Sequence, residues 1–137
     1  MDPLPHWPEG TAAVLCTTGP HAIPVSTPTR ADDRRLLFAL GPRREALRRI
    51  REDPRAALCV LAPGVAFTAH GLVTVLREEM EDVPITALEL RAERVQDHLA
   101  DGRTAIDAGP AWHWTEERAA EADRSVRAEL RRLARTD

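Results

Sequence analysis

A single change of hydrophobic period within the first hundred residues constrains the fold of this chain more than any other feature. Six short apolar runs, each bounded by glycine, proline or charged turn residues, lie at 11–18, 21–30, 35–40, 55–61, 65–77 and 84–95. Between the third and fourth runs, Ala46, Leu47 and Ile50 instead recur at helical spacing. Short turns between consecutive strands favour antiparallel pairing. The sequence therefore predicts a mainly β fold with α (α+β): a six-stranded antiparallel split β-barrel with one short inserted helix.

Prolines and a glycine inside these runs predict local irregularities. Pro24 and Pro28 both lie in the run 21–30, and neither can donate to a strand ladder, so we expect broken pairing along part of that run. Pro42 is compatible with the first turn of the inserted helix. Gly71 lies in the middle of the longest run and predicts a bulge, a barrel corner or the close approach of a ligand.

The chain after the sixth run follows a different pattern. Residues 98–111 are polar and predict a loop, and Thr115 is a predicted N-cap. Apolar residues then recur on one helical face, at Ala119, Ala122, Val126, Leu130 and Leu133. We therefore expect three regions: an N-terminal arm at 1–10 that packs late or not at all, the barrel at 11–97, and at 98–137 a loop with a C-terminal amphipathic helix that packs on the barrel.

Composition limits the class of protein. A chain of 137 residues suits one domain with one core, and 43% hydrophobic with 30% charged residues is typical of a globular protein. No apolar run approaches the roughly 20 residues that cross a bilayer, and no basic stretch followed by an apolar one opens the chain. Cys16 and Cys59 lie inside apolar runs and are expected to be reduced core thiols. We expect a cytoplasmic location.

The charge is distributed in an unusual way. All the basic residues are arginine, and the formal net charge is −3. A negative protein is a poor candidate for general nucleic-acid binding, so we expect neither nucleic acid nor membrane as a partner. Arginine nevertheless grips phosphate groups well, because its planar fork donates two parallel hydrogen bonds.

The side chains that usually carry catalysis are not arranged for it. The five histidines show no metal-ligand spacing, and we expect no metal site. The chain has no Walker loop, no Gly-x-Ser-x-Gly elbow and no Gly-x-Gly-x-x-Gly turn. Cys16 and Cys59 lack neighbouring charge that would activate a thiolate. We therefore assign no catalytic residue, and any chemistry is expected to come from a cofactor.

One basic cluster, residues 41–49 (GPRREALRR), is a candidate binding site. It places guanidinium groups at a helix start, where free backbone N–H groups and the helix dipole attract anions. Arg43 and Arg44 are therefore candidate phosphate ligands. The alternative is a solvated helix face, in which these arginines pair with Glu45, Glu52 and Asp53.

From residue 11 to about residue 75 the chain resembles the pyridoxamine 5′-phosphate oxidase-like split barrels, which bind FMN or the deazaflavin coenzyme F-420. The resemblance depends on the order and spacing of several motifs, 19–25 (GPHAIPV), 36–38 (LLF), 50–58 (IREDPRAAL) and 68–73 (TAHGLV). It implies a homodimer with two cofactor sites at the subunit interface.

The resemblance also assigns roles to individual residues. It implies that the segment Pro24, Val25, Ser26 and Thr27 lies near the cofactor ring, and that Arg43 and Arg44 hold the cofactor phosphate. In one respect the chain departs from the family, because Ala46 occupies the position at which the family commonly has a phosphate-gripping lysine. Arg43, Arg44 or Arg48 would substitute for it, or the site is degenerate.

Three tryptophans and one histidine are further candidates for contact with a ligand or for packing. Trp112 and Trp114 project to the same side of an extended segment, where they either cover a flavin ring, anchor the dimer or pack the terminal helix on the barrel. We select Trp112 as the candidate cofactor contact. His70, beside Gly71, either contacts a ligand or is a satisfied strand histidine. Trp7 is expected to be a lid or a packing anchor.

Three functions remain in competition. The first is an FMN- or deazaflavin-dependent oxidoreductase that transfers hydride to or from a small organic substrate. The second is a non-catalytic module that binds flavin, deazaflavin or haem. The third is a structural dimer without a ligand, and it requires that Arg43 and Arg44 make salt bridges and face no cavity. The sequence does not identify the substrate.

Overall fold

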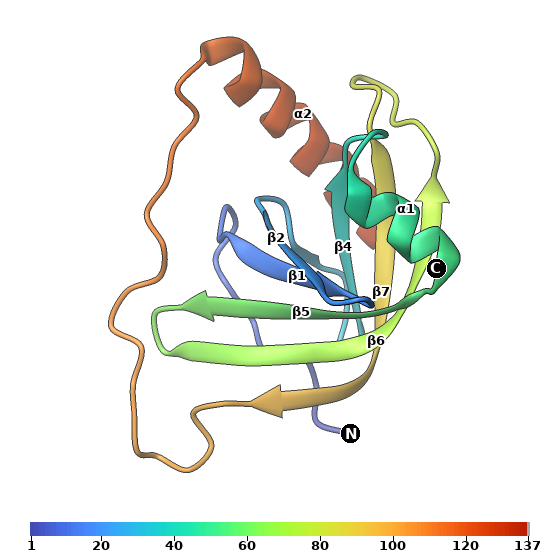
Figure 1. Cartoon of the computed structure of the whole chain (residues 1–137). Coiled ribbons are helices and arrows are strands. Elements are labelled where there is room, and N and C mark those ends of the chain that lie inside the picture. The colour runs from blue at the N-terminus through green and yellow to red at the C-terminus, as the bar shows by residue number, and fades with distance from the viewer. Residues whose placement is uncertain (137) are drawn as a thin grey trace.

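The computed structural model describes residues 1–136 and shows one strongly curled antiparallel sheet with two helices (Figure 1). The strands are β1 (Ala13–Thr17), β2 (His21–Val25), β3 (Thr29–Arg30), β4 (Arg35–Leu40), β5 (Arg55–Ala62), β6 (Val65–Arg77) and β7 (Thr86–Asp97). Their order across the sheet is β2-β1-β5-β6-β7-β4-β3, and every adjacent pair is antiparallel. The predicted split barrel of mixed β and α structure is confirmed.

The sheet has seven strands instead of the predicted six, because the run 21–30 divides into β2 and β3. β2 pairs with β1, whereas β3 pairs with β4 at the opposite edge of the sheet. The connecting residues include Pro28, which has no N–H to donate, and the Ala39 N–H donates to Thr27 Oγ1 over 3.2 Å. This short connection joins the two edges, so the chain itself closes the curled sheet.

A β-bulge bends the two longest strands. The register between β6 and β7 shifts between His70 and Gly71, where Glu93 on β7 is the extra residue. A Cβ atom at Gly71 would lie 1.9 Å from the carbonyl oxygen of Arg91, so no residue with a side chain fits there. The bulge predicted at Gly71 is present, and the close neighbour is backbone. β6 and β7 curve around the barrel through this region (Figure 1).

The inserted helix, α1 (Glu45–Glu52), closes one end of the main core. Ala46, Leu47 and Ile50 are buried there, as their spacing predicted. The prediction that Pro42 lies in the first helical turn is wrong, because the Arg44 N–H bonds to the Gly41 carbonyl (3.1 Å) in a separate turn and the helix begins at Glu45.

The N-terminal arm is part of the packed structure. Leu4 is 1% exposed, and its backbone N–H donates to the Asp33 carbonyl (2.8 Å). The Trp7 indole N–H donates to the Pro28 carbonyl (2.9 Å), and its ring lies 5.4 Å from that of Phe67. The alternative that the arm does not pack at all is wrong, because Leu4 and Trp7 reach the core between the prolines.

The C-terminal helix, α2 (Glu117–Ala134), packs outside the barrel. A second, smaller apolar cluster holds it, comprising Leu37, Met80, Ala87, Val126 and Leu130 with partly buried neighbours. Val126 and Leu130 thus confirm the predicted apolar face. The predicted cap at Thr115 is wrong: the helix begins two residues later, its N-cap is Glu116, and no described side chain caps it.

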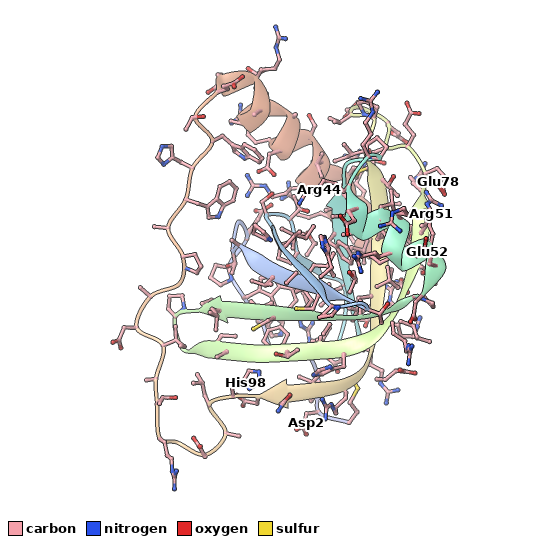
Figure 2. The ribbon with its side chains drawn as sticks, viewed as in Figure 1. Asp2, Arg44, Arg51, Glu52, Glu78 and His98 are labelled. Carbon is pink, nitrogen blue, oxygen red and sulfur yellow. The ribbon has the colours of Figure 1, made fainter. Side chains whose placement is uncertain are left out.

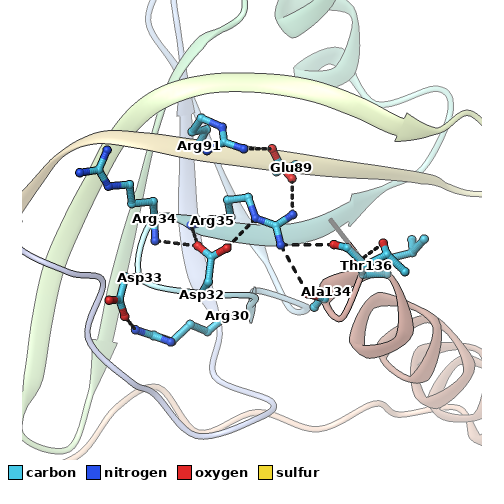
Figure 3. Close-up of polar contacts among 10 residues, drawn as sticks. Arg30, Asp32, Asp33, Arg34, Arg35, Glu89, Arg91, Ala134 and Thr136 are labelled. Carbon is cyan, nitrogen blue, oxygen red and sulfur yellow. Dashed lines mark hydrogen bonds and ion pairs between the residues drawn. The ribbon is translucent and has the colours of Figure 1, made fainter.

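A buried arginine joins the end of α2 to the sheet. Arg35 bonds to Asp32 (2.7 Å) and Glu89 (2.9 Å), and it also donates to the carbonyls of Ala134 (3.5 Å) and Thr136 (3.4 Å) (Figure 3). α2 is therefore anchored at its C-terminal end. Asp137, the last residue of the predicted C-terminal region, lies outside the described residues. Within residues 1–136, no helix is long and apolar enough to cross a membrane.

Candidate functional site

A hollow of about 550 Å³ runs along one face of α1, from the turn before the helix to its last residue, Glu52. Four arginines and two glutamates line it together with Pro42 and Leu47, namely Arg43, Arg44, Arg48, Arg51, Glu45 and Glu52. No side chain among residues 1–136 caps the helix. The Leu47 N–H already donates to the Arg44 carbonyl (3.2 Å) and Ala46 is completely buried, so Glu45 is the exposed residue at the helix start whose N–H faces solvent. We call this space the α1 hollow. Figure 2 labels Arg44, Arg51 and Glu52 around it.

The arginines of the α1 hollow are not equivalent. Arg48 lies 3.1 Å from Glu52 and 3.8 Å from Glu45, and Arg51 pairs with Glu78 (Figure 2). Outside the hollow lining, Arg49 bonds to Glu45 (2.7 Å) and by that bond lowers the carboxyl pKa of Glu45.

By contrast, Arg43 and Arg44 are exposed and form no ion pair within the described chain. They are the two cations of the hollow that an incoming anion would meet without competing with a carboxylate. The predicted pair therefore lies in one place, on the turn that leads into α1.

Ala46, at the position where the resemblance implies a phosphate-gripping lysine, is completely buried. Its methyl group packs in the main core beside Leu47 and Ile50. A phosphate ligand cannot act from that site, because the Cβ points into apolar surroundings. The helix therefore uses this position for packing.

A second hollow, of about 220 Å³, separates the N-terminal half of α2 from the sheet. Ser26 and Thr27 form one wall, Val83 and Ile85 lie on another side, and Trp114 and Asp123 belong to the helical side. Most of its other lining is alanine and valine. We call this space the α2 wedge.

The residues of the segment 24–27, which the resemblance places near the cofactor ring, do not all face the same space. Ser26 and Thr27 line the α2 wedge, whereas Val25 is 5% exposed and belongs to the main core. Pro24 is exposed on β2. Alternation along the strand sends neighbouring side chains to opposite faces, so these residues do not present one continuous surface.

Trp112 and Trp114 form an edge-to-face pair with ring centroids 5.5 Å apart. The Trp112 indole N–H donates to the Gly10 carbonyl (2.8 Å), so this ring ties the C-terminal segment to the N-terminal arm. Trp114, which is 41% exposed, is the tryptophan that lines the α2 wedge. The sequence places both tryptophans on the same side of an extended segment, so it could not tell them apart. Their different packing in the fold distinguishes them.

Asp123 is the residue of this region that the sequence analysis missed. Its side chain is 2% exposed and lines the α2 wedge. Arg127 Nη2 lies 2.8 Å from Oδ2, but this oxygen has no hydrogen-bond partner of good geometry among residues 1–136. A signal was present, because Asp123 falls three or four residues from Ala119 and Val126 and therefore interrupts the apolar face of the helix.

The α1 hollow and the α2 wedge lie at the same end of β4. Ala39 lines the α2 wedge and Pro42 lines the α1 hollow. Three residues of extended chain span at most about 11 Å. A ligand with an anionic group at one end and a planar group at the other would therefore need only modest length to contact both.

A third hollow, of about 370 Å³, lies at the bulge. It is lined by Cys16, Arg55, His70 and the bulged Glu93 among others. His70 Nε2 lies 3.0 Å from Arg94 Nη2 and is thus a satisfied strand histidine. Burial, with a smaller contribution from Cys59, raises the pKa of the Cys16 thiol, so neutral pH favours its unreactive form.

The outer face of the sheet exposes apolar side chains on three neighbouring strands. Val14 on β1, Leu61 on β5, and Leu72 and Leu76 on β6 are each 39–41% exposed. In the register, Val14 lies opposite Cys59. Cys59 in turn pairs with Thr68, and Leu72 pairs with Arg55, so polar residues separate these apolar side chains on the face.

Comparison with known proteins finds one matching family model and several solved structures with a similar fold. The family model described as pyridoxamine 5′-phosphate oxidase matches residues 6–112. No curated protein matches the chain. Among solved structures, HupZ from Group A Streptococcus has 13% identity and a TM-score of 0.57, covering 72% of this chain and 90% of that one.

Two further structures are similar over comparable lengths. An F-420 reductase has 16% identity and a TM-score of 0.55, with 68% of this chain and 98% of that chain covered. A FAD-binding protein from Mesorhizobium loti has 13% identity and a TM-score of 0.52, with 64% and 84% covered. At these identities the structural similarity concerns the fold alone.

Proposed function

Because the chain belongs to the pyridoxamine 5′-phosphate oxidase family, we propose that it is a flavin-nucleotide-binding oxidoreductase. It uses FMN, or the deazaflavin coenzyme F-420, to transfer a hydride to or from a small organic substrate. The similar structures include an F-420 reductase and a FAD-binding protein, which supports a cofactor of the flavin type.

The α1 hollow is the observation that carries this proposal. Arg43 and Arg44 are exposed and lack an ion-pair partner in the described chain, and they adjoin an uncapped helix N-terminus. This set of groups suits a phosphate, because two guanidinium groups without a carboxylate partner in the described chain lie beside a helix start, where the helix dipole also favours an anion. The residues present therefore fit the phosphate end of the cofactor, even though Ala46 replaces the usual lysine.

The ring end of the cofactor would lie beside β2 and the β2–β3 connection. Pro24, Ser26 and Thr27 would contact it, and Trp112 stays the predicted aromatic contact. When bound, the flavin supplies the hydride chemistry, accepting or returning two electrons and one proton. The chain's own part is to orient the ring and to exclude water, and no side chain is needed as a nucleophile.

We also propose that the protein is a homodimer. The exposed apolar residues Val14, Leu61, Leu72 and Leu76 support an interface on the outer face of β1, β5 and β6. Exposed apolar side chains that gather on one face of a sheet are a candidate contact with a second copy of the chain. In the family arrangement, the cofactor sites lie where the two subunits meet.

The test is a titration of the purified protein with FMN and with the deazaflavin coenzyme, each followed by fluorescence. We expect saturable binding of one of them. The double variant Arg43→Ala/Arg44→Ala should weaken that binding at least about tenfold, and riboflavin, which lacks the phosphate, should bind both proteins alike.

The matched control removes two exposed arginines elsewhere, Arg103 and Arg118, and should leave the titration unchanged. Absence of saturable binding of either cofactor by folded wild-type protein would refute the proposal.

A non-catalytic cofactor-binding module is the second candidate. The burial of Ala46 favours it, because this chain has given up one phosphate ligand for packing. The two functions differ in one measurement: bound flavin that is not reduced or reoxidised by any small-molecule donor or acceptor identifies the module. The ligand-free structural dimer required ion pairs at Arg43 and Arg44, and the described residues provide none.

A further inference from the structure

The α2 wedge exists because α2 is attached to the barrel mainly at one end. Arg35 binds the last carbonyls of the helix, and Leu130 packs in the small apolar cluster. The other end begins at Glu116 without a side-chain cap among the described residues. It also follows a long segment that runs outside the barrel without helix or strand (Figure 1). The helix thus leans away from the sheet toward its N-terminus.

The walls of the wedge select the shape of an occupant. Trp114 presents an exposed ring at one side, and Val83, Ile85 and Ala119 provide apolar walls. A space of about 220 Å³ between flat apolar surfaces suits one or two fused rings and is smaller than a typical drug-sized site of roughly 300 Å³ or more.

Asp123 selects the chemistry of that occupant. Its carboxylate is almost completely buried, and among residues 1–136 its ion-pair partner is Arg127, whose Nη2 lies 2.8 Å from Oδ2. A carboxylate accepts several hydrogen bonds, and buried polar atoms without partners are uncommon and call for an explanation. A ligand N–H that reached Asp123 would supply the well-aligned hydrogen bond that Arg127, although 2.8 Å from Oδ2, does not make among the described residues.

The wedge also excludes one class of ligand. Among the described residues, Asp123 is the one charged residue in its lining, and Arg127 already pairs with that carboxylate. An anionic group placed there would meet a negative charge in apolar surroundings, which is strongly unfavourable. A substrate with its own phosphate, as in the name of the family, does not fit this space.

We propose that the α2 wedge is a binding site for a small, planar, non-anionic heteroaromatic molecule that donates an N–H group to Asp123. That this molecule is the substrate of the oxidoreductase rests on the proposed function, since Ser26 and Thr27 line the wedge and also adjoin the expected ring position. The binding site itself is defined by the walls of the wedge and by Asp123.

The test uses indole as the probe and benzofuran, which has the same shape without the N–H, as its control. Isothermal titration calorimetry is performed on the full chain without added cofactor. Indole should bind about tenfold more tightly than benzofuran, because only indole satisfies Asp123. Asp123→Asn should weaken indole binding about fivefold and leave benzofuran binding unchanged, because a charged acceptor bonds more strongly than a neutral one.

Filling the wedge provides an independent test. Ala119→Phe places a ring in the space and should weaken indole binding at least about tenfold. Glu121→Phe, on the exposed side of the same helical turn, is the matched control and should have no effect. Circular dichroism establishes that each variant is folded. Equal binding of indole and benzofuran, or indole binding that survives Ala119→Phe, overturns the proposal.

The experiment also separates this inference from the proposed function. Arg43→Ala/Arg44→Ala should lose FMN or deazaflavin binding and keep indole binding, because the two spaces are distinct. If neither cofactor binds while indole passes both tests, the cofactor proposal fails and the wedge remains a ligand site. If a cofactor binds while indole fails either test, the wedge proposal alone is refuted.

Discussion

The two helices differ in how the barrel holds them, and that difference separates two kinds of candidate site. α1 buries Ala46, Leu47 and Ile50 in the main core. α2 lies on a small outer cluster and is secured near its C-terminus by Arg35. The short helix is thus fixed along its length, whereas the long helix is fixed chiefly at one end.

This contrast matches what each space is suited to bind. A phosphate site needs donors held in place, and α1 supplies a fixed N-terminus with Arg43 and Arg44 beside it. An apolar site for variable small molecules tolerates movement of its wall, and α2 supplies such a wall. Four measurements test this contrast.

The largest effect is expected at the anchor of α2. Arg35→Ala leaves Glu89, which is 11% exposed, without its closest cation, and should lower the free energy of unfolding by about 3–5 kcal/mol. Arg91→Ala removes a more exposed arginine that lies 4.0 Å from the same carboxylate. Arg91→Ala should therefore lower the free energy of unfolding by less than about 1 kcal/mol. Urea unfolding followed by circular dichroism measures both, and equal losses would contradict the assigned role of Arg35.

A smaller loss of stability is expected where α1 enters the core. Ala46→Lys restores the residue typical of the family, but the site is completely buried. Overpacking alone should cost about 1–3 kcal/mol, and FMN binding should not improve. The matched change Arg44→Lys lies on the exposed turn and should leave the unfolding midpoint unchanged. Tighter FMN binding by Ala46→Lys would show that this position reaches the phosphate.

Within the α1 hollow, the effect of each arginine on cofactor affinity should follow its pairing. Arg44→Ala should weaken FMN binding at least about fivefold. Arg48→Ala should change it less than about threefold, because Glu52 and Glu45 already engage that guanidinium. Fluorescence titration at fixed ionic strength gives both values. The reverse ranking would place the phosphate along the side of the helix.

The smallest effect concerns the end of α1 and its dependence on pH. Hydrogen bonds from the Arg55 side chain and backbone lower the pKa of Asp53 from 3.8 to about 2. A carboxyl group with a lowered folded-state pKa stabilises the protein above its usual pKa, and this contribution is lost as the pH falls from about 4 toward about 2. Asp53→Asn should therefore be slightly less stable than wild type at pH 7 and nearly equal to it at pH 2. A difference that stays constant in urea unfolding across this range would contradict the assignment.

Much of the fold was predictable because its signals are local. The alternation along each strand, the helical spacing of Ala46, Leu47 and Ile50, and the bulge at Gly71 all appear in short stretches of sequence. Errors arose where two local signals competed. Pro42 suggested a helix start, but a turn between Gly41 and Arg44 comes first, and Thr115 suggested a cap that the described helix does not use.

The candidate site was predictable only in part. Arg43 and Arg44 were selected from their place after a strand and before a helix, and the structure brings them into one hollow. Trp114 and Asp123 were not selected, because their value depends on α2 lying against the β2–β3 connection. That contact joins residues about a hundred positions apart.

The sequence by itself determined the sheet, the two amphipathic helices and the basic turn before α1, because hydrophobic period and charge are properties of neighbouring residues. Only the tertiary structure decided that Ala46 is sealed in the core, that Arg43 and Arg44 stay unpaired in the described chain, and that Asp123 lines an apolar wedge. Burial and pairing depend on which distant surfaces meet, and the closure of the curled sheet is what brings those surfaces together.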